Sequence, residues 1–415
     1  MAQHNTRSLA AAMVLSTTLL LPGCATPVTQ EPAEASPTIS PTRTPLPSET
    51  PTPTALSWVN YLPTRTPPPP IPLAPIGVTN GADIQLLFTQ DVPWDNHSYG
   101  LAHVSPLNDL VALAPRYGPV TLLSLPWAGD GILLPQVKPS AIDSLSVSAL
   151  SLAFTPDGTL LAVASSDDTV DITDLSRRQP RVTLRIDDWT TSAAFTDDGA
   201  KIAVGTLRGF GGSLQLWDVA SGTLEEQLIR DPPGGGICSL ALSPSGALLV
   251  AGYCTYAYSI ATWSVDDHYR QMPNITGLDE VQYCPHFCPE ERNLLVFAPG
   301  AVMVASGTTM PTIPMFDALT GRLQLVITTA RRGAEGEMYV PHPINGLAFS
   351  GDGSLLAIAA GNELQLRNTQ DGAFLWHKEN PWDVVWSAVA FTPDSRLMIS
   401  VDSTGKVHFW GVPED

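Results

Sequence analysis

Residues 151–164 read Ser-Leu-Ala-Phe-Thr-Pro-Asp-Gly-Thr-Leu-Leu-Ala-Val-Ala, and this stretch decides the fold class. Two apolar runs flank the central Thr155-Pro156-Asp157-Gly158. Pro presets φ, Asp hydrogen-bonds locally and Gly adopts positive φ, so these four residues predict a tight turn between two strands. Because both runs are apolar throughout rather than alternating, each strand is expected to be covered on both faces.

The same hairpin pattern occurs seven times in all, at intervals of about 40 to 55 residues. A period of this length combined with strand chemistry is typical of a propeller array rather than a sandwich. The sequence therefore predicts an all-β, seven-bladed β-propeller in which the blades stack against each other. The first strands of the seven hairpins are expected to end at Val104, Phe154, Phe195, Leu242, Phe297, Phe349 and Phe391.

A third strand is expected after each hairpin, and the best copy reads Leu214-Gln215-Leu216-Trp217-Asp218. This pattern resembles the WD40 repeat family, whose third strand ends in Trp-Asp. The Gly-His dipeptide of that family is absent, which puts its structural hydrogen-bond relay in question, with Asp167 and Asp402 as candidate remnants. Degenerate equivalents of Trp-Asp are Thr173-Asp174, Trp263-Ser264, Phe316-Asp317, Arg367-Asn368 and Trp410-Gly411.

The two ends of the repeat region are expected to pair. Residues 407–410 form a third strand with too little chain after them for a fourth, whereas residues 84–89 form a spare strand before the first hairpin. Propellers of the family that this chain resembles close their ring by such a pairing, which also removes exposed strand edges.

The N-terminal part predicts an exported and tethered protein. Residues 1–23 contain Arg7 and an apolar run, 9–21, which is too short to span a bilayer but long enough for a signal peptide. Leu21-Pro22-Gly23-Cys24 resembles a bacterial lipobox, although Pro22 replaces the usual small residue. The resemblance implies cleavage before Cys24 and a lipid on its thiol. A conventional cleaved signal followed by a chance cysteine is the alternative.

Residues 24–78 are rich in Pro, Thr, Ser and Ala. Large apolar side chains are too few there to form a core, and dense proline favours an extended stalk. The expected organisation is therefore a signal peptide at 1–23, a lipidated disordered stalk at 24–78 and the propeller at 79–415.

The net charge of the chain excludes one class of partner. Lys and Arg total 21 against 40 Asp and Glu, which gives a net charge of −19. Nucleic-acid binding needs clustered cations, so no nucleic-acid partner is expected. We expect a monomer that is exported, lipid-anchored to the membrane and facing the extracytoplasmic side, where it binds protein partners.

No catalytic motif, phosphate-binding loop or metal-ligand spacing is present, so no catalytic residue, metal or cofactor is assigned. Four cysteines remain besides Cys24, and in an exported chain an even number predicts disulfides. Sequence leaves three pairings open, although the first two cysteines flank one hairpin and could bridge it. The last two belong to a short Cys-Pro-His-Phe-Cys loop, for which a metal or redox site is the alternative. The four are Cys238, Cys254, Cys284 and Cys288.

Tryptophans and aspartates precede several first strands, and their loops should meet on one rim of the disc. Such aromatic residues often anchor partners, whereas packing between blades is the alternative. The expected function is a non-enzymatic protein-binding scaffold. The alternatives are a carbohydrate or small-ligand sensor subunit and a propeller hydrolase or lactonase, which would need acidic or histidine metal ligands at the central channel. The expected rim consists of Trp94, Asp95, Asp187, Asp188, Trp189, Trp382, Asp383 and Trp386.

Overall fold

The computed structural model places the propeller in a compact unit, Leu56–Asp415, which is separate from Met1–Ala55. Residues 1–71, which include the lipobox Leu21, Pro22, Gly23 and Cys24, lie outside the described residues, as do Trp94, Asp95, Cys284 and Cys288. The described residues are 72–92, 100–107, 110–115, 120–125, 132–133, 148–209, 211–230, 235–254, 260–272, 294–307, 311–329, 331–332, 338–339 and 343–414.

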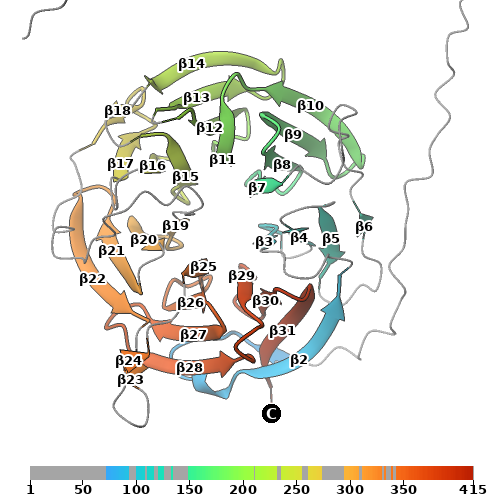
Figure 1. The fold of residues 1–415 in the computed structure, drawn as a ribbon, viewed down its shortest axis with the longest axis vertical. Coiled ribbons are helices and arrows are strands. Elements are labelled where there is room, and N and C mark those ends of the chain that lie inside the picture. Colours follow the sequence, from blue (N-terminus) through green and yellow to red (C-terminus); the bar gives the residue numbers. More distant parts are fainter. Residues whose placement is uncertain are drawn as a thin grey trace, which may run out of the picture. The chain divides into compact units, whose positions relative to one another are not determined.

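Seven antiparallel sheets surround a central axis, as the seven hairpins of the sequence predict (Figure 1). We number these blades 1 to 7 along the chain. Blade 1 contains β3 (Gly100–Val104), β4 (Leu110–Pro115), β5 (Thr121–Ser124) and β6 (Ile132–Leu133). Blade 2 contains β7 (Ala149–Phe154), β8 (Leu160–Ser165), β9 (Thr169–Asp174) and β10 (Gln179–Arg185). Blade 3 contains β11 (Trp189–Phe195), β12 (Lys201–Leu207), β13 (Ser213–Asp218) and β14 (Thr223–Arg230).

The remaining blades follow the same plan. Blade 4 contains β15 (Ile237–Leu242), β16 (Leu248–Tyr253), β17 (Ile260–Ser264) and β18 (Arg270–Gln271). Blade 5 contains β19 (Leu294–Phe297), β20 (Met303–Gly307), β21 (Thr312–Asp317) and β22 (Arg322–Thr328). Blade 6 contains β25 (Ile344–Phe349), β26 (Leu355–Ala360), β27 (Glu363–Asn368) and β28 (Phe374–Glu379). Blade 7 contains β29 (Trp386–Phe391), β30 (Met398–Asp402) and β31 (Lys406–Pro413), joined by β2 (Gln85–Asp91) and β1 (Leu73–Ala74).

Two small elements lie outside this plan. A short hairpin, β23 (Arg331–Arg332) with β24 (Met338–Tyr339), is inserted between blades 5 and 6. The 3-10 helix η1 (Gly81–Asp83) lies between β1 and β2. Within the described ranges, no helix has the length and apolar character needed to cross a membrane.

The hairpin turns have the chemistry that the sequence predicts. In blade 2 the Thr155 hydroxyl donates to Asp157 Oδ1 over 2.6 Å, Asp157 accepts from the Thr159 amide, and Gly158 has a φ of 67°. The same hydroxyl–carboxylate pair, also at 2.6 Å, closes the equivalent turns of blades 3, 6 and 7. The Thr155 hydrogen bond is the main cause that holds the pKa of Asp157 below its ordinary value. These aspartates are therefore turn-forming residues.

The core lies between neighbouring blades rather than at the axis. One apolar cluster joins residues of blades 2 and 3, and another joins blades 5 and 6. All six residues of β26 are fully buried, which explains why the strands read as continuous apolar runs. Each fully buried Leu, Ile or Val contributes about 1.5 to 3 kcal/mol, so the stacking of blades is the main source of stability.

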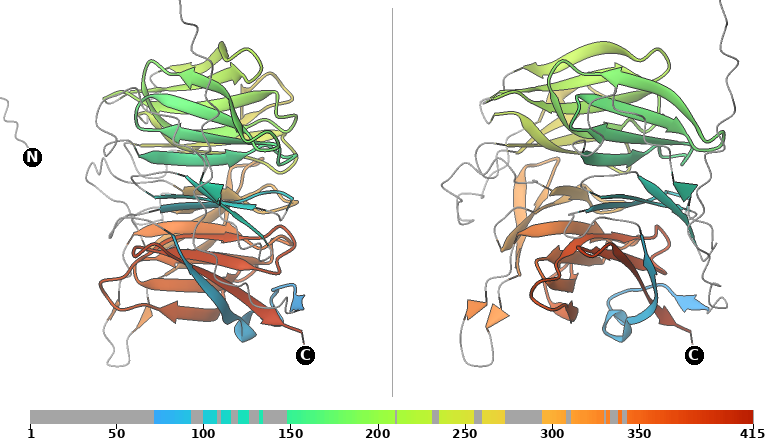
Figure 2. Two further views of the ribbon diagram at one scale, coloured as in Figure 1. Left: turned by 90° about the vertical axis from the view of Figure 1, so that its right-hand side faces the viewer. Right: turned by 45° about the vertical axis from the view of Figure 1, so that its right-hand side comes forward.

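The predicted closure of the ring is confirmed. β2 runs antiparallel to β31, with Gln85 opposite Gly411 and Asp91 opposite Lys406. β1 extends the same edge, with Leu73 opposite Pro413 (Figure 2). The propeller therefore includes residues before the expected boundary at 79. These residues are rich in proline, but the apolar side chains of Leu73 and Ile76 among them are buried in the core.

The antiparallel order gives the ring two distinct faces. The loop face carries the connections between blades and the turns between second and third strands. The turn face carries the turns between first and second strands and those between third and fourth strands. The N-terminal strap, residues 72–84, joins the ring on the turn face, where the Ile76 amide donates to the carbonyl of Ser395 over 2.8 Å. Ser395 lies in the β29–β30 turn and has a φ of 58°. The equivalent residue in the turn of blade 2 is Gly158.

Candidate interaction face

Two predicted rim tryptophans are exposed on the loop face. Trp189, the first residue of β11, is 49% exposed, and Trp382, between β28 and β29, is 86% exposed. Asp383 beside Trp382 is exposed too. Trp189 is the first residue of blade 3 whereas Trp382 precedes blade 7, and these blades lie on opposite sides of the ring (Figure 1). The structure therefore places them on one face but in two separate sites.

The rim prediction was wrong for Trp386. This residue is 0% exposed and packs edge-on against His408 and Trp410, with ring centroids 4.9 and 6.2 Å away. Trp386 stands five residues before the end of β29, at a repeat position that is buried in other blades too, where it is Ala149, Thr190, Ile237 and Ile344. Trp386 is consequently part of the core between blades 6 and 7.

Four aspartates gather where blades 2 and 3 meet on the loop face. Two lie in the β8–β9 turn, and two lie in the β10–β11 connection. The Ile186 amide donates to the carbonyl of Asp168 over 2.9 Å, which holds the two segments together. Desolvation, followed by the charges of Asp167 and Asp188, raises the pKa of Asp168. We call this group, with the adjoining tryptophan, the acidic corner: Asp167, Asp168, Asp187, Asp188 and Trp189.

One cation contacts the acidic corner within the described part of the chain. Arg208, in the β12–β13 loop, lies with its Nη1 3.5 Å from Asp188 Oδ1. The carboxylates of Asp168 and Asp187 accept no hydrogen bond from any described residue, in contrast to the turn aspartates. Arg185, at the end of β10 opposite Thr169, is a second arginine next to the corner among the described residues.

Buried polar side chains on the second and third strands form relays that differ from blade to blade. In blade 7, Asp402 Oδ2 lies 2.8 Å from His408 Nε2, and Trp410 donates to Ser400 over 2.8 Å. Burial opposes ionisation of Asp402, but hydrogen bonds from His408 and Thr404 hold its pKa below the ordinary value. The predicted remnant at Asp402 is thus part of a relay. Because Asp402 and His408 are buried between indole rings, we interpret the pair as structural.

Blades 3 and 6 build their relays from glutamine. Trp217 donates to Gln215 Oε1 over 2.9 Å, and Gln215 donates to Ser213 Oγ over 2.9 Å. In blade 6, Gln365 lies between Glu363 and Arg367 and bonds to both. Asp167, the other predicted remnant, accepts from the Thr169 hydroxyl over 2.7 Å.

The inner strands carry little ionisable chemistry. The described residues of β3, β7, β11, β15, β19, β25 and β29 include no Asp, Glu, Lys or Arg and one histidine, His103. His103 lies on the innermost strand of blade 1, and desolvation lowers its pKa to about 4. It packs 5.6 Å from Phe154. In the described ranges no group of three or more His, Cys, Asp or Glu is placed to hold a metal ion.

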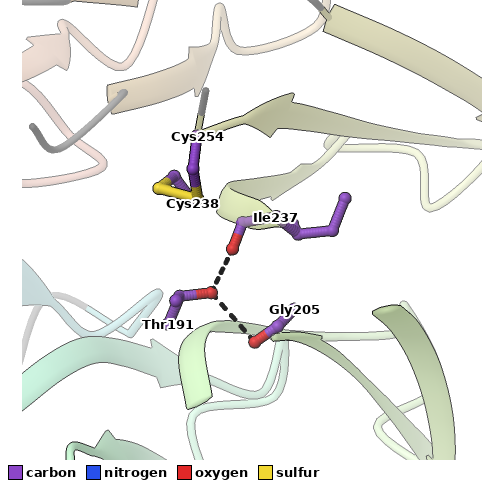
Figure 3. The surroundings of a disulfide bond; sticks show 5 residues. All are labelled: Thr191, Gly205, Ile237, Cys238 and Cys254. Carbon is purple, nitrogen blue, oxygen red and sulfur yellow. Dashed lines mark hydrogen bonds between the residues drawn. A yellow bond between two sulfur atoms is a disulfide. The ribbon is translucent and has the colours of Figure 1, made fainter. Parts of the chain in front are cut away.

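A disulfide joins Cys238 on β15 to Cys254, directly after β16, so the structure selects this pairing (Figure 3). It lies beside a contact between blades 3 and 4. The Thr191 hydroxyl donates to the carbonyl of Gly205 over 2.9 Å and also approaches the carbonyl of Ile237, the residue before Cys238. The register shifts around both segments, so two β-bulges meet at this contact.

Two comparisons bear on this architecture. Residues 143–174, which include most of blade 2, match the family model described as "WD domain, G-beta repeat". A human protein named "U3 small nucleolar RNA-associated protein 4 homolog" is 24% identical over 269 residues, covering 63% of this chain and 36% of that protein. The chain thus spans about a third of the length of this relative. The structure thus shows a seven-bladed β-propeller, and one of its repeats is similar to the WD domain, G-beta repeat.

Proposed function

We propose that this WD40-like propeller is a non-enzymatic scaffold that captures protein partners on its loop face. The observation that carries the proposal is the 86% exposure of Trp382 on a loop held by a rigid ring. An indole in water contributes little to folding, but it buries a large area when a partner covers it. Loops on rigid scaffolds commonly carry recognition, and tryptophan is enriched among the residues that dominate binding energy.

The chemistry of the ring favours binding over catalysis. Metal-dependent hydrolysis at the axis would need converging His, Asp or Glu side chains, and the described inner strands contribute His103 alone. The RNA association in the name of the human relative belongs to that protein. A net charge of −19 argues against a polyanionic partner for this chain.

We further propose that the scaffold is exported and anchored to the membrane by a lipid on Cys24. The sequence of residues 1–24 supports this proposal. Radiolabelled palmitate incorporated by the wild-type chain but not by Cys24→Ala would support the anchor, and equal labelling of both would contradict it.

The scaffold proposal is tested by replacing Trp382 with alanine in the full chain. The matched control is Leu319→Ala, which removes an exposed apolar side chain from the turn face. Partners are captured from native membranes after crosslinking and quantified by mass spectrometry. We expect at least one protein whose capture falls about tenfold in Trp382→Ala but not in the control. Equal capture by all three chains, at equal thermal stability, would contradict the proposal.

A carbohydrate ligand is the second candidate, because an exposed indole face can also stack on a sugar ring. Binding of the chain to a glycan array, abolished by Trp382→Ala and retained by Leu319→Ala, would favour this alternative.

A further inference from the structure

We propose that the Cys238–Cys254 disulfide is a redox-sensitive clasp that fixes the tip of the β12–β13 hairpin on the loop face of blade 3. The tip is defined by Arg208 and Gly211, each of which donates its amide to the carbonyl of the other, over 2.9 and 3.0 Å. A dithiol reductant opens the clasp and releases the tip. The inference is separate from the scaffold proposal, because it concerns the coupling of two loops and not the capture of a partner.

The disulfide closes a β-bulge at the loop-face end of blade 4. The pairing of β15 with β16 shifts register between Ile237 and Ser239, so Cys238 is the extra residue of the bulge. Cys254 directly follows β16, and its amide donates to the carbonyl of Gly236 over 2.8 Å. Both cysteines are partly exposed, so a small dithiol can reach them. The disulfide and this hydrogen bond together hold the segment that enters β15.

Gly236 connects that segment to blade 3. A Cβ atom on Gly236 would lie 2.7 Å from the carbonyl oxygen of Gly211 and 2.7 Å from Cα of Leu207, so the backbones of the two blades touch here and only glycine fits. The Thr191 hydroxyl adds a second contact across the same joint by donating to the carbonyl of Ile237 (Figure 3). The tip therefore packs against the segment that the disulfide holds.

The tip in turn determines the surroundings of two residues of the loop face. Leu207 lies opposite Trp189 in the pairing of β11 with β12. The next residue, Arg208, has its Nη1 3.5 Å from Asp188 Oδ1. A continuous series of contacts thus leads from the sulfur atoms, through Gly236 and the tip, to the indole of Trp189, which is 49% exposed.

Opening the clasp is a two-electron reduction. A thiolate of the dithiol attacks one sulfur atom of the pair and forms a mixed disulfide, and the second thiol of the reductant then displaces the protein thiol. Both cysteines end as thiols, and the reductant leaves as a cyclic disulfide. Two separate thiols need more room than a bonded pair of sulfur atoms, so Cys238 and Cys254 move apart. The segment with Gly236 then loses the bond that fixes it, and the tip loses its support.

The test is hydrogen–deuterium exchange of the full chain before and after treatment with dithiothreitol. The chain carries Cys284→Ser and Cys288→Ser, so that the reductant acts on the Cys238–Cys254 disulfide. Alkylation followed by mass spectrometry counts the thiols that are released.

Reduction should raise exchange about tenfold in the peptide that contains Arg208 and Gly211, because their mutual hydrogen bonds open more often when the tip is released. The reference is the β26–β27 turn of blade 6. There the Gly361 amide donates to the carbonyl of Pro343, the equivalent of the bond from the Cys254 amide. Exchange at this reference turn should be the same in both redox states.

The matched variant is Cys238→Ser with Cys254→Ser. Its tip should exchange as fast as that of the reduced chain, and dithiothreitol should not change it further. The inference is overturned if both thiols are released while the tip keeps its protection, or if exchange at Gly361 rises as much as exchange at the tip. A disulfide that dithiothreitol cannot open in the folded chain would overturn it too.

Discussion

Asp171, on β9, is a carboxylate buried between blades 1 and 2, and its ionisation should destabilise the propeller. It is 8% exposed and accepts a hydrogen bond from the Thr183 hydroxyl over 2.6 Å. Burial raises its pKa from 3.8 to about 6, against the opposing effect of that hydrogen bond. The folded state thus binds the proton more tightly than the unfolded chain does. Stability attributable to this group therefore falls as pH rises from about 4 to about 6.

The magnitude follows from the size of the shift. A displacement of about two pKa units, at about 1.36 kcal/mol each, corresponds to roughly 3 kcal/mol at neutral pH. Asp171→Asn removes the charge but keeps an oxygen that can accept from Thr183. We expect the variant to be about 1 to 3 kcal/mol more stable than wild type at pH 7.5, and the gain to disappear below pH 4.

The assay is urea denaturation of the full chain at pH 7.5 and pH 3.5, followed by tryptophan fluorescence. Asp174→Asn is the control, and its change in stability should have the opposite sign. The reason is that hydrogen bonds, the strongest of them from the Ser176 hydroxyl, lower the pKa of Asp174. That control should lose stability at pH 7.5. A variant Asp171→Asn that is no more stable than wild type at pH 7.5, or that keeps its gain at pH 3.5, would refute the reasoning.

Three further predictions concern the joints of the ring. Thr191→Val should lower the unfolding free energy by about 1 kcal/mol, since it removes the hydroxyl that links blades 3 and 4; an unchanged urea midpoint would contradict this. Cys238→Ala with Cys254→Ala should lower it by about 3 kcal/mol, and added reductant should then have no effect on the variant. Ser395→Ala should cost about 1 kcal/mol because its hydroxyl accepts from the Gly351 amide, whereas Ser395→Gly loses that bond but gains from relief of the positive φ. Equal thermal midpoints for the two Ser395 variants would show that the left-handed backbone carries no strain.

Local patterns were sufficient to predict the blades. Each hairpin depends on a turn whose residues bond to one another, as Thr155 and Asp157 do, so its signal lies within a few positions. The closure was predictable because it follows from a surplus strand at one end and a missing strand at the other. By contrast, nothing local distinguishes Leu73 and Ile76 from the proline-rich sequence before them, and their burial depends on contact with β31 and blade 6.

The candidate site was predictable only in part. Strand order placed Trp189 and Trp382 on one face, and their positions at the third and the seventh hairpin already implied that the ring holds them apart. Trp386 stands five residues before Phe391, which is the position of the buried Thr190 before Phe195, whereas Trp189 stands six residues before Phe195. Alignment of the repeats on these phenylalanines would have separated the two tryptophans. The acidic corner could not be predicted from the sequence, because the sequence does not show which aspartates accept hydrogen bonds within their own turns.

The pairing of β2 with β31 also has a consequence for the order in which the chain must fold. β2 is among the first strands of the domain to be synthesised, and its partner is the last. During synthesis, β2 therefore waits unpaired while six blades assemble, and the entropy of joining such distant segments opposes the final step. A chain cut short before β31 would keep six blades but leave both their terminal faces and an apolar strand open to other chains. The eight residues of β31, Lys406–Pro413, thus complete both the last blade and the junction between the two ends of the ring.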